Sequence, residues 1–419
     1  MKKEEYKIHI IGAGISGLIA AQVLENHGYS PIVLEASDRA GGRIKTDIID
    51  NYQLDHGFQV LLTAYPAANH YLDFGRLNLQ KFFPGAVVFV NKQQKILGDP
   101  LRKPELLFAT LTSNIGSFSD KIKILKLNTL LKKKPLTNIF QEEEKSTLLY
   151  LQEFGFSNDI ITKFFKPFFC GIFLEPNLTT SSRMFEFVYK MFGKGYATLP
   201  KGGIDMIIKQ LVSNLKKTTF QYNTKVSEVK DGFVTIEERI ERKSDFSLIA
   251  TEAHGLVRNL KNQEVEWRQC DTLYFETENK VIQKPLIGLI PDEEALINNI
   301  FYHTSLDTIT TSKNELLSVT VVKNHSLDQK ALIQKVQDEL EKYCDINTSR
   351  FIKHYPIKQA LPKLSNLQGD ISHTETKLTN SIFLAGDQML NGSLNAAIIS
   401  GEQAALGIIK TLESTSIGD

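Results

Sequence analysis

Cysteine is scarce in this sequence, with only 3 among 419 residues. Cys170, Cys270 and Cys344 lie far apart and none belongs to a CxxC pair, which excludes a disulfide framework and a thiolate metal site and fits a reducing cytoplasm. The sequence also lacks an HExxH motif and an EF-hand loop, so we expect no metal. Long apolar runs are missing as well: none approaches the ~20 residues that a membrane-spanning helix needs.

An excess of charge of one sign is absent too. The 49 lysines and arginines nearly balance 48 aspartates and glutamates, giving a net charge of +1, whereas nucleic-acid-binding proteins usually carry a basic surplus. With 42% hydrophobic and 23% charged residues, the composition is typical of a soluble globular protein. The first apolar run breaks at Gly12 without a small-residue cleavage site, so we expect no signal peptide and a cytoplasmic protein. The length predicts two domains or one large interleaved body.

What the sequence does have is a nucleotide-binding pattern at its start. Tyr6–Ile11 is apolar and rich in β-formers, Ser16–Asn26 carries apolar residues at helical spacing, and Pro31–Leu34 indicates a second strand. The glycines of GAGISG, residues 12–17, span the junction of the first strand and the helix. Strand, Gly-rich turn, helix and strand in this order predict a Rossmann-type unit that binds a dinucleotide.

Each glycine of this GxGxxG pattern has a structural reason. Gly12 permits the tight turn, Gly14 lets a pyrophosphate approach the backbone, and Gly17 lets helix and strand pack closely. The free N–H groups and positive dipole end at the start of the helix attract phosphate. Glu35 follows the second strand, where a carboxylate accepts hydrogen bonds from both ribose hydroxyls and disfavours a 2′-phosphate. NADP is therefore the wrong ligand for this site.

A second glycine motif, RAGGR at 39–43, follows shortly after. Two adjacent glycines between arginines suit a backbone N–H concavity for anions, with an arginine to clamp phosphate. GxGxxG, then an acidic residue, then RxGGR resembles the N-terminal signature of the flavin-containing amine oxidase superfamily, which includes monoamine oxidases, protoporphyrinogen oxidases and phytoene desaturases. LDHGFQVLL at 54–62 is similar to the family's segment beside the flavin ring. The resemblance implies bound FAD.

The end of the chain repeats the nucleotide pattern. Phe383–Ala385 indicates a strand, Gly386–Asp387 a turn, and Ala396 the start of a small-residue helix. In the family that this chain resembles, the FAD domain is discontinuous and its last strand and helix return to the flavin. The resemblance implies that Asp387 bonds a ribityl hydroxyl and that the N–H groups of residues 394–396 face the pyrimidine end of the ring. A helix N-terminus suits that place because reduction puts negative charge near N1.

Two middle segments, 196–211 and 246–253, also resemble FAD-domain segments of the family, and Val226 matches the residue whose backbone faces adenine. The C-terminal loop lacks the cysteine that anchors flavin covalently in some relatives, so we expect non-covalent FAD. The residues that we expect to bind it are Gly12, Gly14, Ile15, Ser16, Gly17, Glu35, Ala36, Arg39, Gly41, Gly42, Arg43, Gly57, Phe58, Val226, Gly386, Asp387, Leu394, Asn395 and Ala396.

The fold class implied is α/β with two discontinuous domains. A Rossmann-type FAD-binding domain is expected from residues 1–74, 194–266 and 351–419. An α+β substrate-binding domain, a mixed sheet with a helical layer, is expected from residues 75–193 and 267–350.

Two segments within residues 75–193 each allow two interpretations. The lysine-rich, amphipathic pattern of Lys121–Lys134 fits a solvated helix with one core face, and it also fits a peripheral contact with an anionic membrane. Phe164–Pro176 holds five phenylalanines in 13 residues, which form ordinary core or line an apolar substrate tunnel. Spacing alone does not decide between these interpretations.

Four functions compete at this stage. The first is oxidation or desaturation of an apolar isoprenoid, polyene or tetrapyrrole-like substrate by hydride transfer to flavin N5. The second is amine oxidation, disfavoured because the loop Gln388–Ser393 lacks the aromatic that usually forms an amine cage in this family. The third is a non-redox FAD-dependent isomerase. An NAD-binding regulator without flavin is the fourth, and it would not need RxGGR or Asp387.

The catalytic residues are unknown from sequence, and His56 and Gln59 are weak candidates because their segment is expected beside the flavin. A histidine there tunes the ring, acts as a base, carries a covalent link, or simply bonds backbone or cofactor. Lys358 and His303 are weaker pocket candidates. Nothing resembles a nicotinamide site, so we expect an electron acceptor other than nicotinamide; oxygen, a quinone and another protein are all open at this stage.

Overall fold

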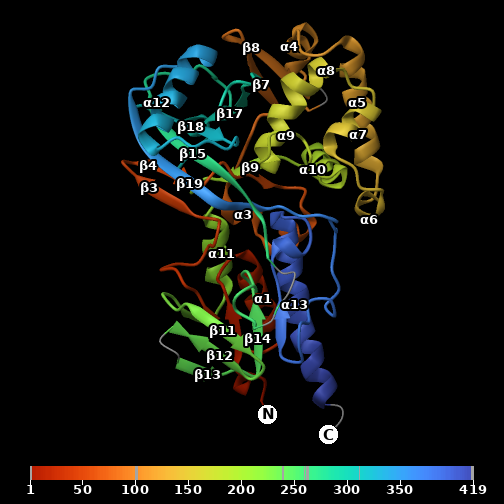
Figure 1. Cartoon of the computed structure of the whole chain (residues 1–419), viewed down its shortest axis with the longest axis vertical. Coiled ribbons are helices and arrows are strands. Elements are labelled where there is room, and N and C mark those ends of the chain that lie inside the picture. The colour runs from red at the N-terminus through yellow and green to blue at the C-terminus, as the bar shows by residue number, and fades with distance from the viewer. Residues whose placement is uncertain are drawn as a thin grey trace.

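The computed structural model describes residues 2–99, 102–237, 240–258, 260, 264–310 and 312–416. A five-stranded sheet, parallel throughout, forms its lower half in Figure 1. Its strands come from three distant parts of the chain, so the sheet closes only when the C-terminal segment returns. In spatial order they are β10 (Thr219–Gln221), β2 (Ile32–Leu34), β1 (Ile8–Ile11), β14 (Phe246–Ile249) and β20 (Ile382–Leu384).

Both faces of this sheet are covered. On one face, α1 (Ile15–Asn26) packs against α13 (Leu394–Ser416), and α11 (Met206–Asn214) packs against α1. The α1–α13 contact is so close that a Cβ on Gly401 would lie only 2.2 Å from the backbone oxygen of Ser16. The other face packs against an antiparallel sheet of β11 (Val226–Lys230), β12 (Phe233–Ile236) and β13 (Ile240–Lys243). Burial on both sides explains why β2 and β20 are apolar throughout.

A seven-stranded mixed sheet lies above the parallel one in Figure 1. Its neighbours pair antiparallel except β16 with β7, and α12 (Gln329–Glu339) with a π-helical turn (Leu340–Cys344) covers it. The order is β19 (Arg350–Pro362), β15 (Trp267–Thr277), β18 (Glu315–Val321), β17 (Ile297–Tyr302), β16 (Ile287–Leu289), β7 (Gly85–Val90) and β8 (Gln93–Gly98).

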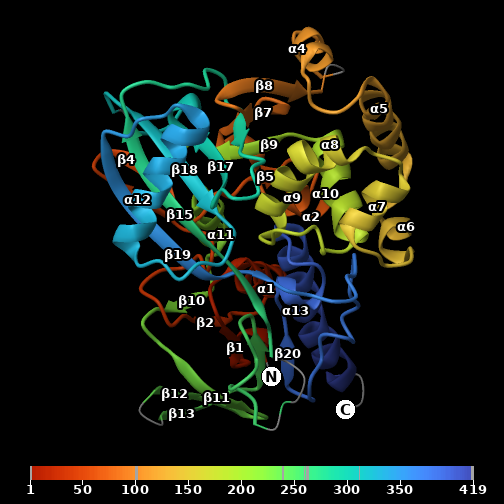
Figure 2. The ribbon, with the colours of Figure 1, turned by 45° about the horizontal axis from the view of Figure 1, so that its top comes forward.

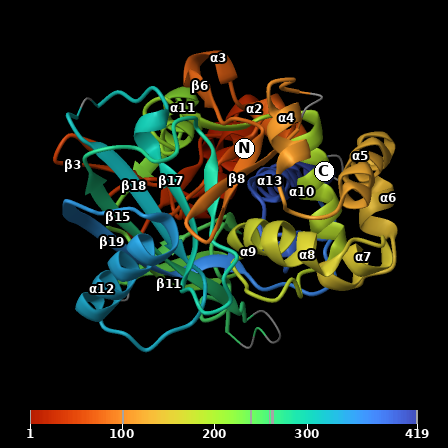
Figure 3. The ribbon, with the colours of Figure 1, turned by 90° about the horizontal axis from the view of Figure 1, so that it is seen from above.

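A helical layer stands beside this sheet, as Figures 2 and 3 show. Serine residues cap four of its helices: Ser117 and Asp120 form a capping box, and the hydroxyls of Ser146, Ser157 and Ser181 accept from the N–H groups of their first turns. The layer consists of α4 (Leu106–Thr112), α5 (Phe118–Lys133), α6 (Leu136–Gln141), α7 (Thr147–Glu153), α8 (Asn158–Ile160), a π-helical turn (Ile161–Phe165), α9 (Lys166–Phe173) and α10 (Ser182–Lys194).

Short elements connect the two halves. One hairpin and one three-stranded sheet lie between them, with two short helices. They are β3 (Thr46–Ile49), β4 (Tyr52–Asp55), β5 (Leu61–Leu62), β9 (Ala197–Pro200), β6 (Leu79–Lys81), α2 (Pro66–Tyr71) and α3 (Phe74–Leu77). Single 3-10 turns occur at Lys3–Glu5, His303–Ser305 and Asp387–Met389.

The predicted α/β fold class, with a discontinuous Rossmann-type sheet and a mixed sheet beside a helical layer, is confirmed. Element bounds differ slightly: α13 begins at Leu394 rather than Ala396, and β1 begins at Ile8 rather than Tyr6. The predicted domain ranges remain a prediction. The residues at 351–362, placed with the FAD-binding ranges, pair in β19 with β15 of the seven-stranded sheet. Of the predicted ranges, residues 1, 100–101, 238–239, 259, 261–263, 311 and 417–419 lie outside the described residues.

Candidate active site

The carboxyl ends of four parallel strands open into one cavity of about 1580 Å³. β1 leads to Gly12, β2 to Glu35, β14 to residues 250–252, and β20 to Gly386 and Asp387, and all of these residues line the cavity. Open parallel sheets bind nucleotides at such an edge because loops and helix N-termini gather there. The cavity therefore combines residues from both ends of the chain and lies at the edge where such sheets bind dinucleotides.

The first glycine loop leaves free space where a phosphate needs it. A Cβ added to Gly14, at the N-cap of α1, would have no atom within 4 Å, so the protein's own packing does not require glycine at this position. Gly17 is different: its Cβ would lie 2.0 Å from the Gly12 oxygen, which explains the close packing of α1 on β1. Gly12 has φ +101°, a conformation that side chains rarely adopt. The loop thus fits a pyrophosphate lying against the backbone.

Glu35 presents an oriented carboxylate to the cavity. One oxygen accepts from the Ala13 N–H at 2.7 Å, and the other accepts from the N–H and hydroxyl of Ser37 at 2.9 and 2.7 Å. The oxygen that accepts from Ala13 keeps a second lone pair for another donor, whereas the other oxygen already accepts two hydrogen bonds. The group is thereby held in place for a diol such as that of a ribose.

The RAGGR loop packs directly on the first glycine loop. The N–H of Gly41 donates to the Ala13 oxygen at 3.0 Å, and a Cβ on Gly42 would lie 3.4 Å from the Gly14 Cα. Both glycines have positive φ, +140° and +58°. Gly41, Gly42 and Arg43 line the cavity, so the two motifs form a single cradle.

Arg43 joins the beginning of the chain to its end. Its guanidinium forms an ion pair with Asp387, whose side chain is 5% exposed, and it stacks over the ring of Trp267 at 5.2 Å. A partly buried Arg–carboxylate pair of this kind fixes both side chains. Arg39, the other arginine of the motif, turns away and pairs with Asp47 at 2.7 Å.

Asp47 organises a cluster with His56 and Tyr355. It accepts from the Tyr355 hydroxyl at 2.8 Å and lies 2.7 Å from His56 Nε2. Burial opposes ionisation of Asp47, but hydrogen bonds from Arg39, His56 and Tyr355 outweigh it and lower the pKa of the carboxyl. The imidazole and the Tyr355 ring, 4.3 Å apart, both line the cavity. Gln59 also lines it, and its amide nitrogen donates to the backbone oxygens of Arg43 and His56.

Most predicted site residues lie around this cavity. Those lining it are Gly12, Gly14, Ile15, Ser16, Glu35, Gly41, Gly42, Arg43, His56, Gly57, Phe58, Gln59, Lys358, Gly386, Asp387 and Leu394. Among the described residues, those outside its lining are Gly17, Ala36, Arg39, Val226, Asn395, Ala396 and His303.

Several of the outlying residues have another partner. The Asn395 side chain accepts from the Ala67 N–H at 2.9 Å, and the Ala396 N–H donates to Ser393 Oγ at 3.0 Å. One of the three N–H groups predicted to face the flavin is thus used to cap α13. Val226 is buried between the two sheets. His303 packs against Phe58 and Phe301, and burial lowers its pKa to about 4, so it is neutral.

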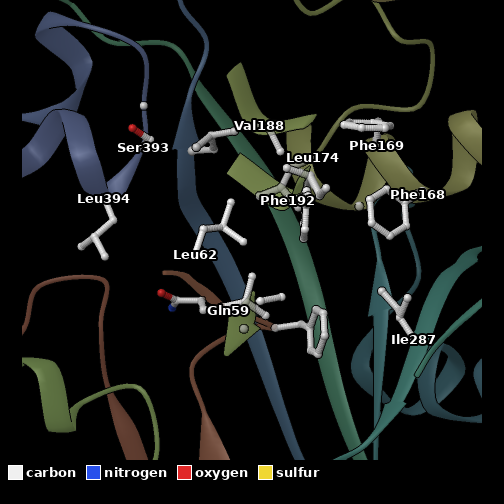
Figure 4. Close-up of a pocket in the computed structure, with 18 of the residues that line it drawn as sticks. Gln59, Leu62, Phe168, Phe169, Leu174, Val188, Phe192, Ile287, Ser393 and Leu394 are labelled. Atoms are coloured by element: carbon white, nitrogen blue, oxygen red, sulfur yellow. The ribbon is translucent and has the colours of Figure 1, made fainter. Parts of the chain in front are cut away.

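The cavity extends into the helical layer. Phe168 and Phe169 of α9 and Val188 and Phe192 of α10 project into it, facing Gln59, Ser393 and Leu394 across the gap in Figure 4. In the phenylalanine-rich segment, Phe164 and Phe168 line the cavity, while Phe165 and Phe173 are fully buried core; a substrate tunnel remains a prediction. Phe169, almost fully buried, does both.

Residues 15–409 match the family model described as flavin-containing amine oxidoreductase. The chain belongs to this family. A mitochondrial protoporphyrinogen oxidase of Nicotiana tabacum is 26% identical over 168 residues, which are 39% of this chain and 32% of the tobacco protein. The chain thus matches about a third of that relative's length.

Solved structures of similar fold cover nearly the whole chain. An oxidoreductase from Methanosarcina mazei has a TM-score of 0.69 at 17% identity, with 97% of this chain and 100% of that one covered. A CLA-producing fatty acid isomerase from P. acnes has a TM-score of 0.70 at 16% identity, with 97% and 99% covered. At these identities the likeness concerns the fold.

FAD is the cofactor of this flavin-containing oxidoreductase. The cavity fits it, since the Gly14 position is open and Glu35 is oriented at the far edge. Its volume exceeds the roughly 300–1,000 Å³ of an ordinary ligand pocket, so a second molecule has room beside the cofactor. Among the described residues, no helix is long and apolar enough to cross a bilayer.

Proposed function

We propose that this flavin-dependent oxidoreductase oxidises or desaturates a largely apolar substrate of the isoprenoid, polyene or tetrapyrrole type. Bound FAD would accept a hydride at N5. The chain's own residues would hold non-covalent FAD with its ribose on Glu35, its pyrophosphate over Gly14 and Gly42, and its ribityl chain near Asp387. The start of α13, at Leu394, would then lie beside the ring.

One observation supports this proposal above the others: a single cavity runs from the glycine loops into a phenylalanine-lined space. Phe168, Val188 and Phe192 line that space. Arg102, which also lines the cavity, donates to the backbone oxygens of Phe192 at 2.8 Å and Gly195 at 2.6 Å. An apolar wall excludes water and orients an apolar C–H group by shape, which is what hydride transfer needs.

Amine oxidation is the weaker alternative. The loop Gln388–Ser393 has no aromatic side chain, and a cage would have to come from other strands. Trp267 and Tyr355 do line the cavity, but the first stacks on the Arg43 guanidinium and the second on His56. Each ring therefore already has another contact.

Isomerisation of an apolar chain is a second alternative, favoured by one observation. The fold shared with the fatty acid isomerase includes the same two halves and covers 97% of this chain. An isomerase would return the flavin to its starting oxidation state in each cycle. For an oxidase or desaturase we propose oxygen or a quinone as the final acceptor.

An anaerobic titration of the FAD-loaded protein tests the proposal. Isoprenoid, polyene and tetrapyrrole-precursor compounds are added in parallel with a panel of amines while the flavin absorption band is followed. We expect one apolar compound to bleach the band. Bleaching by an amine alone would support the alternative, and conversion of an apolar compound without net bleaching would support isomerisation.

A pair of variants ties the result to the cavity. Phe168→Ser should slow bleaching at least tenfold because it removes part of the apolar wall, while the FAD spectrum stays unchanged. Phe154→Ser is the matched control, since Phe154 stacks on Phe156 outside the cavity lining. Equal rates for the two variants would place the substrate elsewhere.

A further inference from the structure

The exposed large hydrophobic side chains of this protein are concentrated in one place. Among the described residues, 14 such side chains are exposed, and seven of them lie between residues 107 and 130 on α4 and α5. Six form what we call the α4–α5 patch: Leu107, Phe108, Leu111, Phe118, Ile122 and Leu125. Phe108 is 78% exposed and Phe118 is 69% exposed, values unusual for phenylalanine in water.

The α5 part of the patch is a second apolar stripe on a helix that already has one. Leu127 and Leu131 are fully buried and bind α5 to the core. Phe118, Ile122 and Leu125 follow i, i+4, i+7 spacing on the opposite side. A helix needs only one apolar stripe to pack on a soluble protein, so the second stripe is available for a partner.

The patch adjoins the active-site cavity. Leu107, Leu111, Phe118, Ile122 and Leu125 line the same cavity that contains the glycine loops. Figure 2 shows α4 and α5 at the outer end of the helical layer, away from the parallel sheet. The surface patch and the apolar part of the cavity are therefore continuous.

The lysines of α5 lie beside the apolar stripe. By helical periodicity, Lys121 and Lys132 follow one edge and Lys126 and Lys133 the other. Not all of the positive charge faces outward: the Lys121 amine donates to the carbonyls of Leu111 and Ser113. Lys126 and Lys133 are exposed.

We propose that the α4–α5 patch inserts into the surface of a lipid bilayer, so that apolar substrate passes from the lipid directly into the cavity. The insertion is driven mainly by the apolar side chains, with Lys126 and Lys133 contacting anionic headgroups. A bilayer suits this surface better than a second protein chain because the apolar interior of the bilayer would be continuous with the apolar wall of the cavity. The passage of substrate rests on the proposed function, whereas lipid binding is tested without it.

Flotation of the FAD-loaded protein with vesicles tests the inference. One vesicle preparation is phosphatidylcholine alone, and the other contains one fifth phosphatidylglycerol. We expect binding to both, stronger with the anionic lipid. The triple variant Phe108→Ser, Phe118→Ser, Ile122→Ser should lower the partition coefficient at least about 30-fold.

The control replaces three exposed hydrophobic residues outside the patch, Ile48→Ser, Phe233→Ser and Ile240→Ser, and should float like the parent. The FAD absorption band confirms that each variant is folded. The inference is overturned if the parent does not float, if the triple variant floats as well as the control, or if only anionic vesicles bind and high salt abolishes the binding. Sedimentation as a dimer that the triple variant dissociates, without flotation, would instead assign the patch to self-association.

Discussion

Two glycine-to-alanine substitutions distinguish the roles of glycine at the two ends of the chain. Gly14 has φ −77° and ψ −177°, which alanine adopts freely, and its added Cβ would meet no protein atom within 4 Å. Alanine is a poorer N-cap than glycine, but it also restricts the unfolded chain, and these effects nearly cancel. We expect Gly14→Ala to change the stability of the FAD-free protein by less than about 1 kcal/mol.

The same methyl group would lie where the pyrophosphate approaches the backbone. Overfilling a close-packed contact costs about 1–3 kcal/mol, which raises the FAD dissociation constant about 5- to 150-fold. FAD at 100 times the parent's dissociation constant adds about 2.7 kcal/mol to the free energy of unfolding. For a variant weakened 100-fold, the same FAD concentration adds only roughly 0.4 kcal/mol.

Gly401→Ala should behave in the opposite way. Its Cβ would lie 2.2 Å from the Ser16 oxygen and 2.9 Å from the Ser16 Cα, so α13 must move away from α1. Alanine gains about 1 kcal/mol of helix propensity at a mid-helix site, which is too little to offset such a backbone clash. We expect the FAD-free protein itself to lose about 1–3 kcal/mol.

Urea unfolding of each variant with and without FAD, together with an FAD fluorescence titration, separates the two effects. Parent-like FAD affinity in Gly14→Ala would refute the placement of the pyrophosphate. Parent-like stability of FAD-free Gly401→Ala would refute the α1–α13 packing.

Three further outcomes follow from the same structure. Burial raises the pKa of Asp55 to about 7, so the folded protein keeps a proton that the unfolded chain releases above about pH 4. The free energy of unfolding of the parent should therefore fall between pH 4.5 and 7.5, by up to about 4 kcal/mol relative to Asp55→Asn. Urea titrations of both proteins across this pH range measure the difference. Asp387→Ala leaves Arg43 without its carboxylate and should weaken FAD binding at least tenfold by fluorescence titration; unchanged binding would contradict its assignment. Lys190→Met leaves backbone oxygens at the end of α5 without their donor and should lower the unfolding free energy by about 1–3 kcal/mol, measured by urea unfolding.

The glycine-loop half of the cavity was predictable because backbone conformation and close backbone contacts determine which residues it can contain. Gly12 has φ +101° and Gly17 has no room for a Cβ. Only glycine fits these two positions, so they are recognisable in the sequence. Glu35 follows its strand at a spacing set by the same unit. These local requirements identify strand, turn and helix without knowledge of the rest of the chain.

The mixed sheet was less predictable because its pairing is distant. β7 joins β16 across almost 200 residues, and its hairpin turn at Asn91 and Lys92 has φ values of 51° and 63° without the Asn-Gly pair that usually signals such a turn. The cluster of Asp47 with Arg39 and Tyr355 was likewise hidden, since Tyr355 comes 308 residues later in the chain.

The two halves of the cavity should therefore respond differently to substitution. On the side where we propose that FAD binds, one methyl group at Gly14 would meet a ligand of fixed shape, and the ion pair of Arg43 with Asp387 has no equivalent replacement. On the substrate side, Phe168, Val188 and Phe192 act through size and apolar surface, which other hydrophobic residues also provide. A family that keeps FAD can consequently change its substrate by repacking a few side chains of α9 and α10. Exchanging residues within this apolar wall, with the glycine loops untouched, is the physically direct way to alter which molecule the flavin oxidises.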